Sequence, residues 1–180
     1  RMNTVDLHEA VETFLGGSSD FLLCYSSQNM FKQLQVDEVE YLHIGVDELL
    51  PVCLADTQAK ACFKVQEEST LKMLSHTPES FFGQLIALQC YSQLPTSITL
   101  EHCYQSSLSE ALKALALKGK GVAFLPHSIV KRELEQGKLV KMEHPLMSIP
   151  LQITLYRLKY SQSTQAQKLW HEIKHKHDPP

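Results

Sequence analysis

Two short polar clusters each stand between the end of an expected strand and the start of an expected helix. The first cluster is Ser75, His76, Thr77 and Ser80, and the second is Gln105, Ser106 and Ser107. Ligands of open α/β sheets bind beyond the carboxyl ends of strands, where helix N-termini present unpaired amides. The clusters therefore predict a small-molecule site, with Phe124 and Tyr25 as weaker candidates at the ends of two further strands. The alternative is that the serines only cap helices and that His76 is an exposed loop residue.

The segment HEIKH, residues 171–175, has the spacing of the zinc-protease helix motif. In such a motif, His171 and His175 would lie one turn apart and Glu172 would act as general base. The segment lies near the end of the chain and no third ligand follows it, so we favour the exposed face of a terminal helix. In that interpretation Leu169, Trp170 and Ile173 face the core. A small metal-dependent hydrolase is the alternative function.

Neither a GxSxG nucleophile elbow nor a GxxxxGK phosphate loop occurs in the chain. The motifs of a nucleophilic hydrolase and of a nucleotide-binding enzyme are thus absent. We expect no enzymatic activity and no cofactor.

The five cysteines are odd in number and show no CxxC spacing. Buried free thiols are the favoured interpretation, because reduced cysteine behaves as a small hydrophobic residue. A redox sensor would need an accessible thiolate beside a cation. Cys62, between Lys60 and Lys64 in a polar stretch, is the possible redox residue.

Length and composition are those of a globular protein: 180 residues, 43% hydrophobic and 21% charged, enough for one core or two linked lobes. The net charge of −3 gives no basic field for gripping nucleic acid directly. No apolar run reaches the roughly 20 residues of a membrane span, and no signal-peptide pattern is present. We therefore expect a cytoplasmic protein with no membrane partner, and not an exported solute-binding protein.

The stretch from Ser106 to Val140 predicts helix, strand, helix and strand in succession. Ser106 or Ser107 can cap the first helix. Ser107 with Glu110 has the spacing of a capping box, and Gly119 suits the C-terminal cap. Residues 121–125, GVAFL, predict a strand buried on both faces. A helix over about 128–136 and a strand at KLVKM follow.

The rest of the chain continues the alternation of helices and strands. The pattern predicts helices at 6–17, 79–93 and 162–175, the first of them capped by Asp6. It predicts strands at 21–25, 71–75, 97–103 and 150–157, and two extended segments in 38–56 that a polar break at Asp47-Glu48 separates. This order favours an α/β fold with doubly wound parallel sheets.

Four segments resemble, in order, the effector-binding domain of LysR-type transcriptional regulators. They are VDLHEAVETFLGGSSDFLLCY at 5–25, DELLPVCLAD at 47–56, ALKALALKGKGVAFLP with the following GKLV, and IPLQITLYR at 149–157. The match covers essentially the whole chain, and its specificity lies in the ordered set. SSLSE together with SFFGQLI resembles the oxidant-responsive, hypochlorite-sensing branch.

The resemblance implies a periplasmic-binding-protein-like fold of two lobes, residues 1–52 with 150–180 and residues 53–149. The first lobe would be truncated at its N-terminus, and the winged helix-turn-helix that binds DNA is absent from this chain. The implied function is effector sensing in an interlobe cleft lined by the two polar clusters. The implied partners are a small-molecule effector, DNA only through the missing domain, and further copies in a homodimer or homotetramer. The surfaces that we expect at that interface are helices 6–17 and 79–93.

Overall fold

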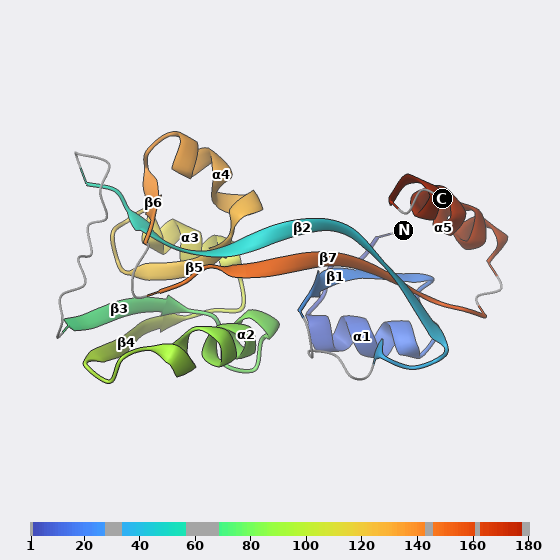
Figure 1. Cartoon of the computed structure of the whole chain (residues 1–180), viewed down its shortest axis with the longest axis horizontal. Helices are drawn as coiled ribbons and strands as arrows, with labels where there is room; N and C mark the ends of the chain where they lie inside the picture. The colour runs from blue at the N-terminus through green and yellow to red at the C-terminus, as the bar shows by residue number, and fades with distance from the viewer. Residues whose placement is uncertain (1, 28–33, 57–68, 143–145, 161–162, 178–180) are drawn as a thin grey trace. The chain divides into compact units, whose positions relative to one another are not determined.

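A computed structural model describes residues 2–27, 34–56, 69–142, 146–160 and 163–177 (Figure 1). Helices and strands alternate along much of the chain. In order they are α1 (Leu7–Leu15), β1 (Phe21–Ser26), β2 (Val39–Leu54), β3 (Ser69–Ser75), α2 (Phe81–Gln89), the 3-10 turn η2 (Tyr91–Gln93), β4 (Ile98–Gln105), α3 (Ser109–Ala116), β5 (Val122–Pro126), α4 (His127–Glu135), β6 (Leu139–Lys141), β7 (Ile149–Leu158) and α5 (Thr164–His177). None of the helices in these ranges is long and apolar enough to cross a membrane.

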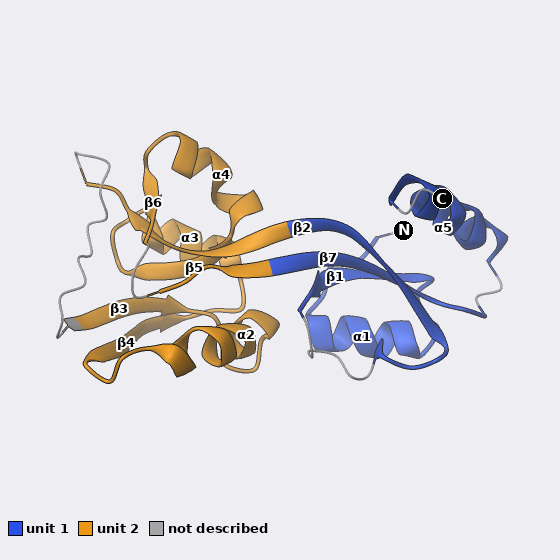
Figure 2. Cartoon of the chain, in the orientation of Figure 1, with its two compact units in different colours: residues 1–46, 151–180 blue, residues 47–150 orange. Residues whose placement is uncertain are grey.

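The chain forms two compact units, one of Arg1–Val46 with Leu151–Pro180 and the other of Asp47–Pro150 (Figure 2). We call them unit 1 and unit 2. The implied division into lobes at residues 52 and 150 stays a prediction, as does the truncation of the first lobe.

In unit 2 the sheet order is β2-β5-β3-β4, with β6 paired to β2. Strand β3 runs parallel to both β4 and β5, whereas β2 is antiparallel to β5 and to β6. The α/β fold is thus confirmed, and the antiparallel pairing of β2 is the departure from the expected parallel sheet. The sheet is mixed because β2 enters the unit in the direction opposite to β5.

Strand β5 lies at the centre of unit 2 and is buried at all five positions, as the run GVAFL predicts. Its side chains alternate between the two faces of the sheet. Ala123 and Leu125 belong to a core cluster with the apolar face of α3, whereas Phe124 contacts Tyr91 on the other side. Helix α3 and the 3-10 turn η2 therefore lie against opposite faces of the same strand.

The predicted capping box at Ser107 is wrong. Helix α3 begins at Ser109, and its N-cap residue is Leu108, which makes no side-chain cap. The hydroxyl of Ser106 instead accepts from the amide of Leu108 at 3.1 Å, two residues before the amide of Glu110 that the box requires. The local bond outcompetes the box because it closes a two-residue turn before the helix begins.

The predicted break at Asp47-Glu48 is also wrong, because β2 runs without interruption through both residues. Groups on neighbouring segments pair with both carboxylates. Asp47 accepts from the amide of Ser128 at 3.2 Å, and Glu48 lies 3.6 Å from Lys141 Nζ. Polar residues in a strand indicate a break only when nothing beside the strand pairs with them.

In unit 1, β1 is antiparallel to β7 and α1 packs its apolar face, including Val11 and Phe14, into a small core. The Asp6 carboxylate caps α1 by accepting from the amide of His8 at 2.9 Å, as predicted. Two buried hydroxyls, Ser26 and Thr154, bond to each other at 2.5 Å.

Helix α5 is anchored by Trp170, which is buried. The Trp170 ring stacks on the ring of Phe21 at a centroid distance of 6.3 Å. The guanidinium of Arg157 lies 4.7 Å from the Trp170 ring and 2.6 Å from Glu40. Leu169 was expected to face the core but is 46% exposed, because it lies one residue round the helix from the anchored face.

Helix α2 is shorter than the predicted helix 79–93, since it ends at Gln89 and a 3-10 turn follows. Its start is tightly built. The Ser80 hydroxyl donates to the Thr77 carbonyl at 2.7 Å and accepts from the Gly83 amide at 3.1 Å. A Cβ on Gly83 would lie 2.1 Å from the Thr77 oxygen, so only glycine fits here.

We predict that Gly83→Ala destabilises the protein by about 1–3 kcal/mol, the usual cost of overpacking. Helix propensity alone would favour alanine by about 1 kcal/mol, so the variant is less stable only if the steric clash costs more than this gain. Urea unfolding measures the change. Gln84→Ala, an exposed change in the same turn, is the control and should stay within about 0.5 kcal/mol. A Gly83→Ala variant at least as stable as the wild type would contradict the packing.

Candidate functional site

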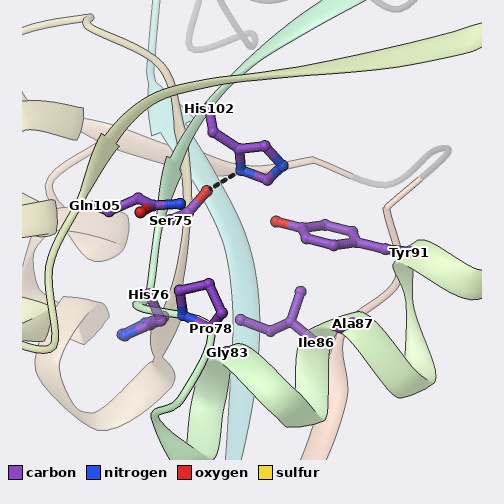
Figure 3. A pocket seen from close by; sticks show the side chains of 9 residues that line it. All are labelled: Ser75, His76, Pro78, Gly83, Ile86, Ala87, Tyr91, His102 and Gln105. Carbon is purple, nitrogen blue, oxygen red and sulfur yellow. Dashed lines mark hydrogen bonds between the residues drawn. The ribbon is translucent and has the colours of Figure 1, made fainter.

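A cavity of about 360 Å³ opens in unit 2 between the carboxyl ends of β3 and β4 and the inner face of α2 (Figure 3). The parallel pairing brings Ser75 opposite Gln105, so the two predicted polar clusters meet at one edge of the sheet. The lining residues are Ser75, His76, Pro78, Gly83, Ile86, Ala87, Tyr91, His102 and Gln105.

Three side chains make the polar wall of this pocket. Ser75 Oγ lies 2.6 Å from His102 Nδ1, and the Tyr91 hydroxyl points toward both residues (Figure 3). Burial raises the pKa of Tyr91 to about 12, although a hydrogen bond with Ser75 opposes the rise. Tyr91 therefore keeps its proton at neutral pH and is a hydrogen-bond donor.

His76 is 4% exposed, so the interpretation as an exposed loop residue is wrong. Its Nε2 lies 2.8 Å from the carbonyl oxygen of Phe124. A carbonyl can only accept, so Nε2 must carry the proton. Burial lowers the pKa of His76, with the bond to Phe124 opposing, and the ring is neutral. Its Nδ1 is then an acceptor, and it is buried with no partner among the described residues.

The opposite wall of the pocket is apolar and comes from one face of α2. Gly83, Ile86 and Ala87 recur at helical spacing, and Pro78 lies in the turn before the helix. None of the lining side chains carries a fixed charge. The pocket can therefore hold a small molecule by hydrogen bonds at one side and by apolar contact at the other.

Of the predicted site residues, Ser75, His76 and Gln105 line the pocket. Thr77 and Ser80 form its supporting turn, and the Ser106 amide donates to the Ser75 carbonyl at 3.0 Å.

The remaining predicted residues lie elsewhere. Ser107 is exposed and does not line the pocket, and Tyr25 is in β1 of unit 1. Phe124 contributes its carbonyl to His76 and contacts Tyr91 at a ring-centroid distance of 6.3 Å. The roles of all these residues in binding an effector stay predictions.

Sequence reasoning missed Tyr91, His102 and the apolar face of α2. The helical spacing of Gly83, Ile86 and Ala87, continued by Tyr91, was a usable signal for one wall. His102 gave no such signal. Its approach to Ser75 depends on the register of β3 and β4, which shifts between Met73 and Leu74.

Nothing in the described ranges supports the metal-dependent hydrolase. His171, Glu172 and His175 are all exposed on α5, and the described residues contain no group of three or more metal-ligating side chains.

The described cysteines are reduced, and they differ in burial. Cys53 and Cys90 are buried, Cys24 is half-buried and Cys103 is exposed. Burial raises the pKa of Cys24 to about 12 and also raises that of Cys90, which disfavours the reactive thiolate. Cys62 lies outside the described residues, and its redox role stays a prediction.

Comparison with known proteins gives one consistent family. A model of the LysR substrate binding domain matches residues 1–178. The HTH-type transcriptional regulator YjiE of Escherichia coli K12 is 28% identical over 175 residues, covering 96% of this chain and 55% of YjiE. The HTH domain-truncated transcriptional regulator QseD of Escherichia coli O157:H7 is 27% identical, covering 96% of this chain and 69% of QseD.

Among solved structures, full-length HypT from Salmonella typhimurium, a hypochlorite-specific LysR-type transcriptional regulator, superposes with a TM-score of 0.84 at 25% identity. The match covers 98% of this chain and 58% of HypT. The chain thus spans between about half and two thirds of these relatives.

The lowered pKa of His76 predicts a pH-dependent stability. The unfolded chain takes up a proton near the ordinary histidine pKa of 6.5, and the folded chain does so only at lower pH. The contribution of neutral His76 to the free energy of unfolding is therefore complete above pH 6.5. It is lost as the pH falls below that value, with a slope of at most about 1.4 kcal/mol per pH unit.

Urea unfolding between pH 7.5 and 5.5 tests this. His76→Gln keeps a donor for the Phe124 carbonyl but removes the titration, so its stability should fall less steeply on acidification than that of the wild type. His127→Gln, at an exposed position, should follow the wild type. Equal slopes for His76→Gln and the wild type would show that His76 does not titrate as its burial requires.

Proposed function

The chain belongs to the LysR substrate-binding domain family, and we propose that it senses a small effector bound in the unit 2 pocket. The observation that carries this proposal is the pairing of a protonated Tyr91 hydroxyl and the Ser75–His102 pair with an apolar wall on α2. Such convergence of a few polar groups in a mostly apolar cavity is typical of a ligand site.

The output that we propose is transcriptional regulation by the whole protein. The relatives are transcriptional regulators, which supports a regulatory function and not an enzymatic one. DNA would be bound by a domain outside these residues, in the cytoplasm. The effector must bind one arrangement of the protein better than another, since equal affinities shift no equilibrium.

We propose that the protein is a homodimer or homotetramer and that α2 contributes to the interface, with α1 as a second surface. Helix α2, FFGQLIALQ, contains no charged residue and is apolar round most of its circumference. Leu88 on its outer side is 64% exposed. A helix of this kind is usually covered on all sides, so a second copy of the chain is a suitable partner.

An oxidant response is a second candidate, which the similarity to HypT favours. The raised pKa values of Cys24 and Cys90 make a response through those thiols unfavourable. A Cys62→Ser variant of the full regulator that loses its response to hypochlorite would support a thiol mechanism through Cys62, and an unchanged response would exclude it.

Effector binding is tested by a thermal-shift screen of small metabolites. A ligand of the pocket should raise the melting temperature of the wild type, and Ser75→Ala should weaken its binding by roughly three- to tenfold through loss of one hydrogen bond. Ser97→Ala, exposed and outside the pocket, is the control. Ligands that bind Ser75→Ala and the wild type equally would show that effectors bind elsewhere.

The proposed interface is tested by Leu88→Glu, which places a charge on the exposed side of α2. Sedimentation should show an association constant reduced at least tenfold, because a buried unpaired carboxylate is costly. Leu169→Glu makes the same change at another exposed leucine, on α5, and should leave association unchanged. An unaffected Leu88→Glu oligomer would remove α2 from the interface.

A further inference from the structure

We infer that the unit 2 pocket selects an uncharged ligand, such as an amide, and not a carboxylate. The inference rests on the proposed binding function and names the chemical class of its ligand. Two features of the pocket carry it: its lack of fixed charge and the prior use of its helix starts.

The first feature is the absence of any fixed charge in the lining. No lysine, arginine, aspartate or glutamate is among the nine residues, and burial keeps His76 neutral. An ion that leaves water for such a pocket loses its hydration without gaining a counter-ion, which is unfavourable. A neutral ligand avoids this cost.

The second feature concerns the helix starts, where anions usually bind in α/β proteins. Beside this pocket the chain fills such positions itself. The Ser80 hydroxyl accepts from the Gly83 amide at the start of α2, and the Ser106 hydroxyl accepts from the Leu108 amide just before α3. A carboxylate would have to displace these serine hydroxyls to reach the two amides.

The size and apolar wall of the pocket complete the description of the ligand. A volume of about 360 Å³ is at the low end of the range for small-molecule sites. Ile86 and Ala87 offer an apolar surface to one side of the ligand. A ring or short branched chain that carries one primary amide suits these dimensions.

Matched pairs of fragments test the inference directly. Benzamide with benzoate and nicotinamide with nicotinate differ mainly in charge and in the N–H donors. At pH 7.5, titration calorimetry and saturation-transfer NMR with the wild-type protein should show each amide binding at least tenfold tighter than its carboxylate. Tyr91→Phe should weaken amide binding threefold or more, and Tyr104→Phe, outside the pocket, should leave it unchanged.

The outcomes separate the two proposals. If the carboxylates bind as tightly as the amides, and Ser75→Ala weakens them, the pocket is a binding site but the inferred ligand class is wrong. If no fragment binds, or if Ser75→Ala and Tyr91→Phe both bind amides as the wild type does, the proposed binding function of this pocket fails as well. Should Tyr91→Phe fold poorly, the amide-to-carboxylate ratio of the wild type still decides the ligand class.

Discussion

The hydrogen bond from His76 Nε2 to the Phe124 carbonyl joins the turn after β3 to the central strand β5. Because the acceptor is a backbone oxygen in a fully buried strand, the bond fixes both the position of the turn and the tautomer of the ring. The Ser80 and Gly83 contacts with Thr77 then set where α2 begins relative to the same turn. The pocket walls are thus built outward from one buried imidazole.

Two buried side-chain atoms of the described residues have no hydrogen-bond partner, His76 Nδ1 and Glu133 Oε2, and this is unusual in a folded protein. Buried polar groups are nearly always paired, since an unpaired one costs about 1–3 kcal/mol. His76 Nδ1 has no partner in the described part of the chain. The buried hydroxyls of Ser26 and Thr154 satisfy each other, whereas an unpaired buried acceptor such as His76 Nδ1 indicates a place that a water molecule completes.

The local sequence pattern predicted most helices and strands of this fold, whereas features that depend on contacts between distant segments were not predicted. The buried strand β5, the Asp6 cap and the two polar clusters at strand ends all depend on neighbours in sequence. The true start of α3 depends on a local bond, from the Leu108 amide to the Ser106 hydroxyl, that competes with the capping box. The continuous β2 depends on which groups lie beside Asp47 in space. The same limit applies to the site, where Ser75 was recognisable from its position but its partner His102 follows only from the strand register.

Helix α2 connects the pocket to the surface, because one side of it lines the cavity and the other exposes Leu88. The turn at Thr77 holds one end of this nine-residue helix, and Tyr91 follows the other end. A ligand that displaces Tyr91 would therefore move the helix as a rigid unit. One neutral hydrogen bond contributes about 0.5–1.5 kcal/mol, and a few such bonds suffice for the 1–3 kcal/mol of typical allosteric coupling. Conversion of an equilibrium from 1:99 to 99:1 requires about 5.5 kcal/mol of differential binding. A neutral ligand in this pocket would therefore bias the association of α2 surfaces in a graded manner, and a complete switch would need further contacts outside unit 2.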